Sequence, residues 1–585
     1  MNEKRQLPKE WRGGKMDDSK LLAIDPKTDP PSFWQDEQEV LFVSMALIDE
    51  HHGKIKATER KTYRECRKGK TRFSNGDVLF AKITPCVENG KVALVEDLDS
   101  PVCFGSTEFY VLRPTYRLLS EFLLYYVRTS EIRDLAVASF TGTSGRQRVP
   151  SSFWSNIVIP FPPLPVQERI VEILQQADAI RRKRAEARHL ADQILPALFY
   201  HLLEQNQIKI TKKPLNEITL LKTGGTPSRK KAEYWSGSIP WVSPSDMKEL
   251  EIFDTIEHIS EDALSNSSTT IVDPGTILIV VRSGILAHTF PVAIARNRLA
   301  FNQDIKALIP NPDIILPEYL LWALNARKTE VLHRMVKHGS TVHSIDSTLF
   351  NEMLIPIPPL SFQRNFIFQA EQLLNTVEQS QKSYADANNL FASLLSKAFT
   401  GELTAEWEVE NAESIAARQA FYERLPRLVL LALLAEKAQR NKTQAEILVT
   451  ALMKYAFLLQ MEGASRRRFY HFISYHYGPF AKELYTDLHA LQKEGLVAVA
   501  EDANEDKTRI TLTNPQGAQA FLQDLPDDQR ELVSALRQDA ATIIETYDDL
   551  NHGDLLATVY EKYPAYAKKS KLRKKSIFQQ PNKEA

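Results

Sequence analysis

Hydrophobic and polar positions in residues 17–155 form short β-type runs separated by turns. Residues 39–43, 78–83 and 109–112 are rich in Val, Leu, Phe and Tyr, and Asn75-Gly76 is a turn signal before the middle run. Residues 120–138 have helical spacing, with Ser120 as the expected N-cap. The pattern predicts an α/β unit, and residues 214–352 repeat it, with strands expected at 276–281 and 292–295 and a helix after Pro317.

Two long amphipathic helices are predicted after these units, each beginning at a Pro-Pro-Leu run (162–164 and 358–360) where proline pre-sets the first turn. Each spans about 35 residues, or about 50 Å. Two apolar stripes with alternating 3 and 4 spacing most simply pair as an antiparallel coiled coil. Packing of each helix on its own unit is the alternative. The first stripe is Ile173, Ala177, Ile180, Arg184, Ala187, Ala191, Ile194 and Leu198, and the second is Phe366, Ala370, Leu373, Val377, Ser380, Tyr384, Ala387, Phe391, Leu394 and Ala398.

Short sequence matches in one order indicate that a segment of the chain is duplicated. Gly76-Asp77-Val78-Leu79 matches Gly275-Thr276-Ile277-Leu278, and Glu121-Phe122-Leu123-Leu124 matches Glu318-Tyr319-Leu320-Leu321. The Pro-Pro-Leu runs recur 196 residues apart. A repeat this long is a duplicated domain rather than a solenoid unit, because solenoid repeats are a few tens of residues long. Two tandem domains with convergent proline-rich turns are the alternative.

Residues 405–585 belong to neither repeat and read as mainly α-helical. A helix begins after Tyr477-Gly478-Pro479-Phe480 and runs to Glu494-Gly495, and a β-type run follows at 508–513. This order of helices and a hairpin is winged-helix-like.

Composition indicates a globular protein of several domains. The 585 residues are 43% hydrophobic and 25% charged, with a net charge of −1, so nucleic-acid binding would need local basic patches. No apolar run reaches the length of a membrane span, and the first residues form no signal peptide. The three cysteines lack metal-ligand spacing. We expect a cytoplasmic protein.

Familiar catalytic motifs are incomplete in this sequence. Gly69-Lys70-Thr71 resembles the end of a phosphate-binding loop, but Arg64 stands where the loop needs its first glycine. The histidines lack metal spacing with carboxylates, and there is no nucleophile elbow. We therefore expect no catalytic residue, no metal and no enzymatic activity in this chain. An unrecognised nuclease centre is the alternative.

Basic residues in corresponding places of the two units indicate DNA binding. Cations neutralise phosphates, and Arg, Lys and Gln also hydrogen-bond to base edges. A solvated surface is the alternative for each residue taken singly. The candidates are Lys68, Lys70, Arg72, Lys82, Arg146, Gln147 and Arg148 in the first unit and Arg229, Lys230, Lys231, Arg282 and His343 in the second.

The doubled Pro-Pro-Leu-x-x-Gln arrangement, at Pro162 to Gln167 and Pro358 to Gln363, resembles the specificity subunit of type I restriction–modification systems. Residues 222–227, the loop 145–149 and the helix ending at 398–403 are also similar to that family. The resemblance covers residues 17–404. The segment from Tyr477 to Leu496 is similar to a helical domain of some antitoxins.

The resemblance implies a DNA-reading subunit without catalysis of its own. Residues 17–160 and 207–356 would be target-recognition domains for the two halves of a split DNA target, and residues 161–206 and 357–404 the spacer helices between them. Two methyltransferase subunits and motor–nuclease subunits would assemble on the chain, bringing S-adenosylmethionine, ATP and magnesium. The expected subunit-docking residues are Pro163, Leu164, Gln167, Pro359, Leu360 and Gln363.

Two departures and one alternative remain. Residues 339–345 of the second unit lack the Arg146-Gln147-Arg148 of the first, and Arg184 interrupts the first helix. Residues 405–585 are unusual for the family and suggest regulation, a further DNA contact or a structural extension. A stand-alone DNA-binding regulator with an antitoxin-like domain is therefore the other function.

Overall fold

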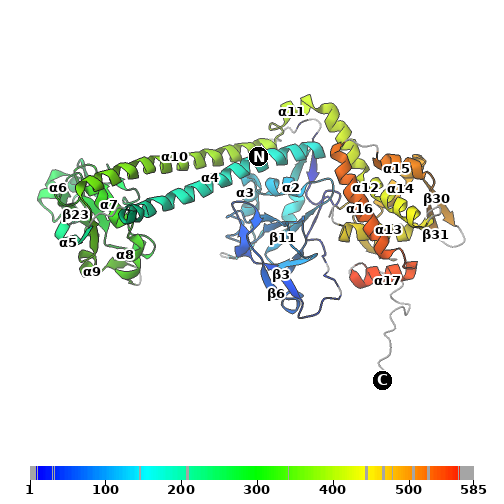
Figure 1. Ribbon diagram of the computed structural model, residues 1–585, viewed down its shortest axis with the longest axis horizontal. Coiled ribbons are helices and arrows are strands. Elements are labelled where there is room, and N and C mark those ends of the chain that lie inside the picture. Colours follow the sequence, from blue (N-terminus) through cyan, green and yellow to red (C-terminus); the bar gives the residue numbers. More distant parts are fainter. Residues whose placement is uncertain are drawn as a thin grey trace, which may run out of the picture. The chain divides into compact units, whose positions relative to one another are not determined.

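The computed structural model describes residue 8 and residues 11–566, except 29, 32, 144–145, 206–209, 340–341, 442–445, 464–467, 477, 503–506, 524–526 and 564–565. The chain divides into two compact units, of which the first combines Met1–Asp178 with Leu390–Ala585 and the second is Ala179–Asn389. Both mix helices with short strands, which confirms the α+β class (Figure 1).

Two four-stranded sheets lie in the N-terminal part of the first unit. The first sheet is antiparallel, in the order β2-β11-β8-β9, and the second has the order β6-β3-β10-β7 with one parallel pair, β3 with β10. Buried side chains of both sheets, including Val43, Phe73, Leu79 and Val111, form one core cluster. The strands are β2 (Leu22–Ile24), β3 (Glu39–Val43), β6 (Glu59–Thr62), β7 (Thr71–Phe73), β8 (Val78–Ala81), β9 (Val92–Leu94), β10 (Cys103–Gly105) and β11 (Phe109–Pro114).

The second unit contains sheets with a corresponding strand order. Strands β14, β23 and β19 are adjacent and antiparallel, as are β2, β11 and β8, and β15 pairs with β22 in parallel, as β3 does with β10. A smaller sheet adds β20, β25 and β24. The strands are β14 (Thr219–Thr223), β15 (Ile239–Val242), β19 (Ile277–Val280), β20 (Arg282–Ser283), β22 (Leu299–Phe301), β23 (Ile305–Pro310), β24 (Val336–Lys337) and β25 (His343–Ile345).

The helix predicted over residues 120–138 is two helices, α2 (Ser120–Val127) and α3 (Ser130–Ala138). The chain breaks at Thr129, whose side chain accepts a hydrogen bond from the Ile132 N–H and so caps α3. The predicted N-cap role of Ser120 is wrong. Its hydroxyl donates instead to the carbonyl of Gly76, and Leu119 occupies the N-cap position.

Both predicted long helices are present as α4 (Leu164–Gln205) and α10 (Leu360–Ala398). In the second unit the rings of Phe199 and Phe366 lie 5.5 Å apart, and the Arg188 guanidinium lies 5.4 Å from the Tyr384 ring. Residue numbers rise along α4 as they fall along α10. The two helices therefore run side by side and antiparallel within this unit (Figure 1).

The predicted apolar stripe holds for α10 but is shifted in α4. Residues Phe366, Ala370, Val377, Phe391 and Ala398 of α10 are buried. Ile180 of α4 is 52% exposed, whereas Ile170 and Leu174 are fully buried. The predicted α4 stripe was therefore wrong and began three residues too late. Ala191, Ile194 and Leu198 lie outside the described side chains.

A buried glutamine fixes the start of each long helix. Gln167 accepts a hydrogen bond from the Leu119 N–H and donates to the carbonyls of Arg117 and Pro162, at 3.0 Å each. Gln363 makes the corresponding three bonds, to the Leu316 N–H and the carbonyls of Ile314 and Pro358, at 2.8–3.0 Å. Both side chains are 0% exposed. Each glutamine is therefore hydrogen-bonded inside the chain, and a contact of Gln167 or Gln363 with another subunit stays a prediction.

The other predicted docking residues differ between the two helices. Leu164 is 3% exposed and belongs to a core cluster with residues of the C-terminal segment, and Pro163 is half-buried. Leu360 is half-buried and Pro359 is exposed.

The C-terminal segment contains the predicted helix and hairpin. Helix α14 (Glu483–Lys493) precedes β30 (Val497–Asp502) and β31 (Lys507–Leu512), and β31 also pairs with β27 (Glu446–Leu448). Helices α12 (Ala412–Asn441), α13 (Val449–Glu462) and α16 (Asp527–Tyr547) pack around a shared core. Tyr477 of the antitoxin-like motif lies outside the described residues. Within the described residues, no helix has the length and apolarity needed to cross a membrane.

Replacing Gln167 with leucine should destabilise the junction of α2 and α4. The change leaves one buried N–H and two carbonyls without their partner, at a cost of about 1–3 kcal/mol. Hydrogen exchange should show faster exchange in α2, whereas Gln175→Leu, at an exposed position of the same helix, should change little. Wild-type protection of α2 in Gln167→Leu would contradict the conclusion that Gln167 fixes the start of α4 against α2.

Replacing the buried Lys454 with methionine should stabilise α13. Lys454 is 1% exposed, and burial lowers its pKa to about 7. Between about pH 7 and its ordinary pKa the unfolded chain binds a proton that the folded chain lacks, so this group's contribution to stability rises with pH. We expect Lys454→Met to gain about 1–3 kcal/mol at pH 7, and less at pH 9.

The measurement is hydrogen exchange of α13 at both pH values. Lys437→Met is the control, because Lys437 forms an ion pair with Asp548 and its loss should destabilise. Reduced protection of α13 in Lys454→Met at pH 7 would refute the buried-amine account.

Candidate nucleic-acid interface

The continuation of β8 and the loop 141–149 bring four predicted DNA-binding residues together. Val149 N–H donates to the Lys82 carbonyl at 2.8 Å, and the Thr84 N–H donates to the Gln147 carbonyl at 3.1 Å. Arg148 forms β-bridges with Ile83 and Thr141. Backbone pairing therefore places Lys82, Arg146, Gln147 and Arg148 at one edge of the sheet.

An acidic residue holds Arg148 in place at this edge. The guanidinium donates to both carboxylate oxygens of Glu108, at 2.9 and 2.8 Å, and this hydrogen bonding lowers the pKa of Glu108. Arg148 also donates to the Arg146 carbonyl at 3.3 Å, yet its side chain remains 46% exposed. Lys82 lies 4.9 Å from the centre of the Tyr110 ring. The cations are thus oriented before any ligand binds, which reduces the entropy lost on binding.

The same backbone arrangement occurs in the second unit. Ile345 N–H donates to the Val281 carbonyl at 2.9 Å, and β20 pairs with β25 so that Arg282 faces Ser344 and Ser283 faces His343. Arg282 is exposed. Among the described residues, Nδ1 of His343 is buried without a hydrogen-bond partner, and its ring lies 5.1 Å from that of His338.

The two arrangements match position by position but carry the cation on different strands. Arg148 corresponds to Ser344, because each lies opposite the second residue after β8 or β19, namely Ile83 or Arg282. The first unit has its arginine on the closing loop, and the second has it on the strand extension. The missing Arg-Gln-Arg of the second unit is therefore offset by Arg282.

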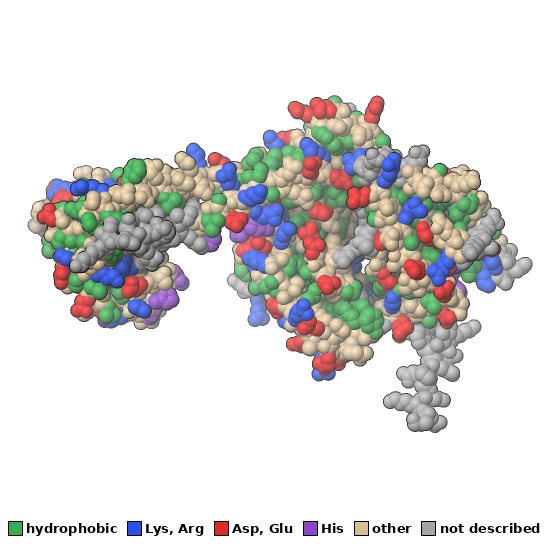
Figure 2. Space-filling view, viewed as in Figure 1, with side chains coloured by type: hydrophobic (Ala, Val, Ile, Leu, Met, Phe, Trp, Pro, Cys, Tyr) green, Lys and Arg blue, Asp and Glu red, His purple; other side chains and the backbone are tan. Residues whose placement is uncertain are grey.

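Lys68, Lys70 and Arg72 belong to the other sheet of the first unit, at and beside β7. Arg72 donates to the Arg67 carbonyl at 2.9 Å, and Lys70 lies 5.4 Å from the Phe42 ring. Neighbouring cations are paired with acids: Arg60 with Glu39, Lys61 with Glu59, Arg64 with Asp36 and Glu37, and Arg67 with Asp36. Acidic residues therefore neutralise much of the basic stretch, and Figure 2 shows basic and acidic side chains interspersed over the face in view.

Arg229, Lys230 and Lys231 follow β14, and their environment differs from the prediction of a simple basic patch. Arg229 stacks on Trp235 at 3.7 Å from the ring centre, and Glu257 accepts hydrogen bonds from its guanidinium, raising the pKa of Arg229. Lys231 donates to the Tyr234 hydroxyl at 2.8 Å, and Lys230 is exposed.

Sequence reasoning missed the acidic partners Glu108 and Glu257. No local pattern marks them, because each is 28 or more residues from its arginine. Among the described residues, no group of three or more His, Cys, Asp or Glu side chains is placed to hold a metal ion.

Comparison with known proteins identifies the family. The sequence pattern described as "Type I restriction modification DNA specificity domain" matches residues 53–188 and 208–383. The EcoR124I/EcoR124II specificity subunit of Escherichia coli is 31% identical over 259 residues, covering 43% of this chain and 62% of the relative. The EcoAI specificity subunit of Escherichia coli is 31% identical over 209 residues, covering 35% of each chain.

The matched regions thus span less than two thirds of the length of these two relatives. Among solved structures, the HsdS subunit from Thermoanaerobacter tengcongensis aligns with 68% of this chain and 99% of its own, with a TM-score of 0.38 and 22% identity. Because the family pattern matches more than half of its residues, in both repeats, the chain belongs to the family of type I restriction–modification DNA specificity domains.

Proposed function

We propose that this chain is the DNA sequence-specificity subunit of a type I restriction–modification complex and has no catalytic activity of its own. The proposal is supported by the sheet edge in each repeat where the continuation of β8 or β19 pairs with the closing loop. At these two edges Lys82 and Arg148 correspond in backbone position to Val281 and Ser344. Arg282 supplies the positive charge that Val281 and Ser344 lack. Arginine and lysine contact phosphates and guanine edges, and glutamine contacts adenine. Each edge would read one half of a bipartite DNA target.

In this proposal the two halves are duplicated target-recognition domains, residues 17–160 and 207–356. The antiparallel helices α4 and α10 form a coiled coil that sets the spacing between the half-sites. Contacts such as Phe199 with Phe366 support the pairing of the helices. Half-sites read from one face of DNA lie about 34 Å apart, a distance that helices of this length can span.

The proposed partners are double-stranded DNA, two methyltransferase subunits and motor–nuclease subunits. S-adenosylmethionine, ATP and magnesium would be bound by those partners. The chain's own residues would bind and orient the DNA, and base extrusion would be a task of the methyltransferase. Methylation by the purified chain alone would contradict the absence of catalysis.

Arg148→Ala and Arg282→Ala should each relax recognition of a different half-site. Loss of one base-reading arginine costs about 1–3 kcal/mol of discrimination at the affected position. The measurement is binding of the complete methyltransferase complex to DNA libraries in which one half-site at a time is randomised.

Arg148→Ala also leaves the Glu108 carboxylate without its partner, so the double variant Arg148→Ala/Glu108→Ala is its control. Relaxation of both half-sites by either single variant would count against two independent reading edges.

Lengthening both long helices should change the spacer and not the bases read. Seven residues inserted after Arg188 and seven before Tyr384, which face each other, keep the heptad register and add about 10 Å, or about three base pairs. Mapping of methylated adenines should find both half-sites unchanged at a longer separation. An unchanged spacer, or new bases in either half-site, would contradict the proposal that the paired helices set the distance between the half-sites.

A further inference from the structure

Within the first unit, the C-terminal segment docks on the start of α4. Glu168, just after the first turn of α4, accepts hydrogen bonds from Arg418, at 2.8 Å, and from the Tyr422 hydroxyl. The Leu164 N–H, which has no partner inside its own helix, donates to Gln419 at 2.8 Å. Leu164 itself is buried in the core of the C-terminal segment. Residues of α12 therefore cover the first turn of α4 with both polar and apolar contacts.

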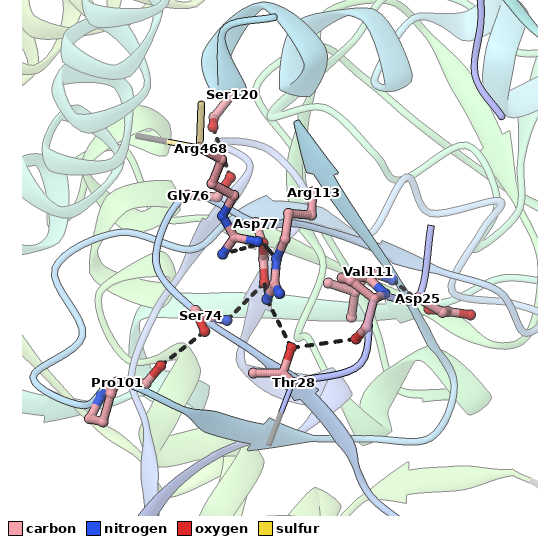
Figure 3. A network of polar contacts seen from close by, with 11 residues as sticks. Asp25, Thr28, Ser74, Gly76, Asp77, Pro101, Val111, Arg113, Ser120 and Arg468 are labelled. Atoms are coloured by element: carbon pink, nitrogen blue, oxygen red, sulfur yellow. Dashed lines mark hydrogen bonds and ion pairs between the residues drawn. The ribbon is translucent and has the colours of Figure 1, made fainter. Parts of the chain in front are cut away.

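A second contact joins the C-terminal segment to the sheet of the same unit. Asp77 is 0% exposed and binds Arg113 through both carboxylate oxygens, and Arg468 approaches the same carboxylate at 3.8 Å (Figure 3). Burial, with Arg113 nearby, lowers the pKa of Arg468. The Tyr116 N–H donates to the Arg468 carbonyl at 3.0 Å. Both contacts thus place an arginine of the C-terminal segment against an acid of the first repeat.

The equivalent positions of the second repeat lack these acids. Arg364 stands 196 residues after Glu168, and Thr276 stands 199 residues after Asp77. Arg364 is exposed, Leu360 is half-buried, and Phe368, one helical turn further, is 60% exposed. An arginine therefore replaces a carboxylate at the start of α10. It lies one helical turn after Leu360, whose counterpart Leu164 is buried by the C-terminal segment in the first repeat.

Charge prevents the C-terminal segment from using the second position. There Arg418 would face Arg364 and Arg468 would face a neutral hydroxyl, and like charges brought together at an interface disfavour the contact. The same argument disfavours a C-terminal segment from a second copy of this chain. A fitting occupant presents a carboxylate to Arg364 and apolar side chains to Leu360 and Phe368, which is the pattern of one face of an amphipathic helix.

We propose that the chain has two equivalent helix-docking faces, one at the start of each long helix, and that residues 405–585 cover the first of them. They close the face at Leu164 and Glu168 and leave open the face at Leu360, Arg364 and Phe368. The open face takes an acidic amphipathic helix of the first methyltransferase subunit, an assignment that rests on the proposed function. The second methyltransferase subunit binds only when the C-terminal segment leaves α4, so this segment controls the order of assembly.

Hydrogen exchange of the full chain tests the docking itself. Glu168→Arg should speed hydrogen exchange of residues 164–172 and 418–425 about tenfold or more, because the introduced side chain would face the like charge of Arg418. Glu168→Arg/Arg418→Glu should restore most of the protection by reversing the pair. Arg364→Glu, at the equivalent position of the second repeat, is the matched control and should leave both segments unchanged. Unaltered exchange in Glu168→Arg would overturn the charge-selective contact.

Native mass spectrometry of the chain titrated with its co-expressed methyltransferase subunit tests the consequence. We expect the wild type to bind one copy tightly and a second copy at least tenfold more weakly. Glu168→Arg should bind two copies with similar affinity, and Arg364→Glu should lose the tight copy. Two equal copies on the wild type, with residues 164–172 still protected, would overturn the exclusion.

The hydrogen-exchange and mass-spectrometry experiments together distinguish failure of this inference from failure of the proposed function on which it rests. If no variant binds the methyltransferase subunit, the scaffolding function is wrong and the assignment of the second face falls with it. Exchange at the start of α4 reports the docking independently of that result.

Discussion

The buried glutamine at the start of each long helix is the constraint on which the rest of the fold depends. Gln167 and Gln363 each bond two backbone groups of the preceding α/β unit and one proline carbonyl just before the helix that follows it. A buried amide that loses such partners costs far more than a surface hydrogen bond. Rotation of a unit about its helix would break the two bonds to that unit, so each glutamine fixes the direction in which its unit faces.

Electrostatics then make the two repeats unequal although their backbones correspond. The first repeat carries Asp77 and Glu168 where the second carries Thr276 and Arg364. Both acids of the first repeat contact arginines of the C-terminal segment. The fold thus supplies two similar surfaces, and a few charges decide which one the chain covers itself.

Much of this architecture was predictable because the periodicity is strong and occurs twice. The α10 stripe from Phe366 to Ala398 was correct, whereas the α4 stripe was misplaced because Arg184 and several alanines weaken the pattern there. Alignment of Ile170 with Phe366 and Leu174 with Ala370 would have located it. The break at Thr129 was missed because capping by a side chain competes locally with helix propagation.

The candidate interface was predictable in residue type and only partly in geometry. Lys82 and Arg148 are distant in sequence, and nothing local indicates that backbone pairing joins them. The Glu108 and Glu257 partners of two arginines, like the docking of Arg418 on Glu168, are tertiary contacts without a sequence signature. The bonds of Gln167 and Gln363 within the chain were not predicted, because a glutamine in a motif looks the same whether it contacts another subunit or its own backbone.

Replacing residues 207–356 with the corresponding segment of the EcoR124I/EcoR124II specificity subunit, followed by mapping of methylated adenines in cells, tests the central claim most directly. The hydrogen bonds of Gln167 would remain, because Arg117, Leu119 and Pro162 are retained. Gln363 would keep its bond to Pro358 and would bond to the backbone groups of the incoming segment that replace Ile314 and Leu316. The account predicts new bases in one half-site, with the other half-site and the spacer length unchanged. A change in both half-sites, or retention of the original target, would contradict it.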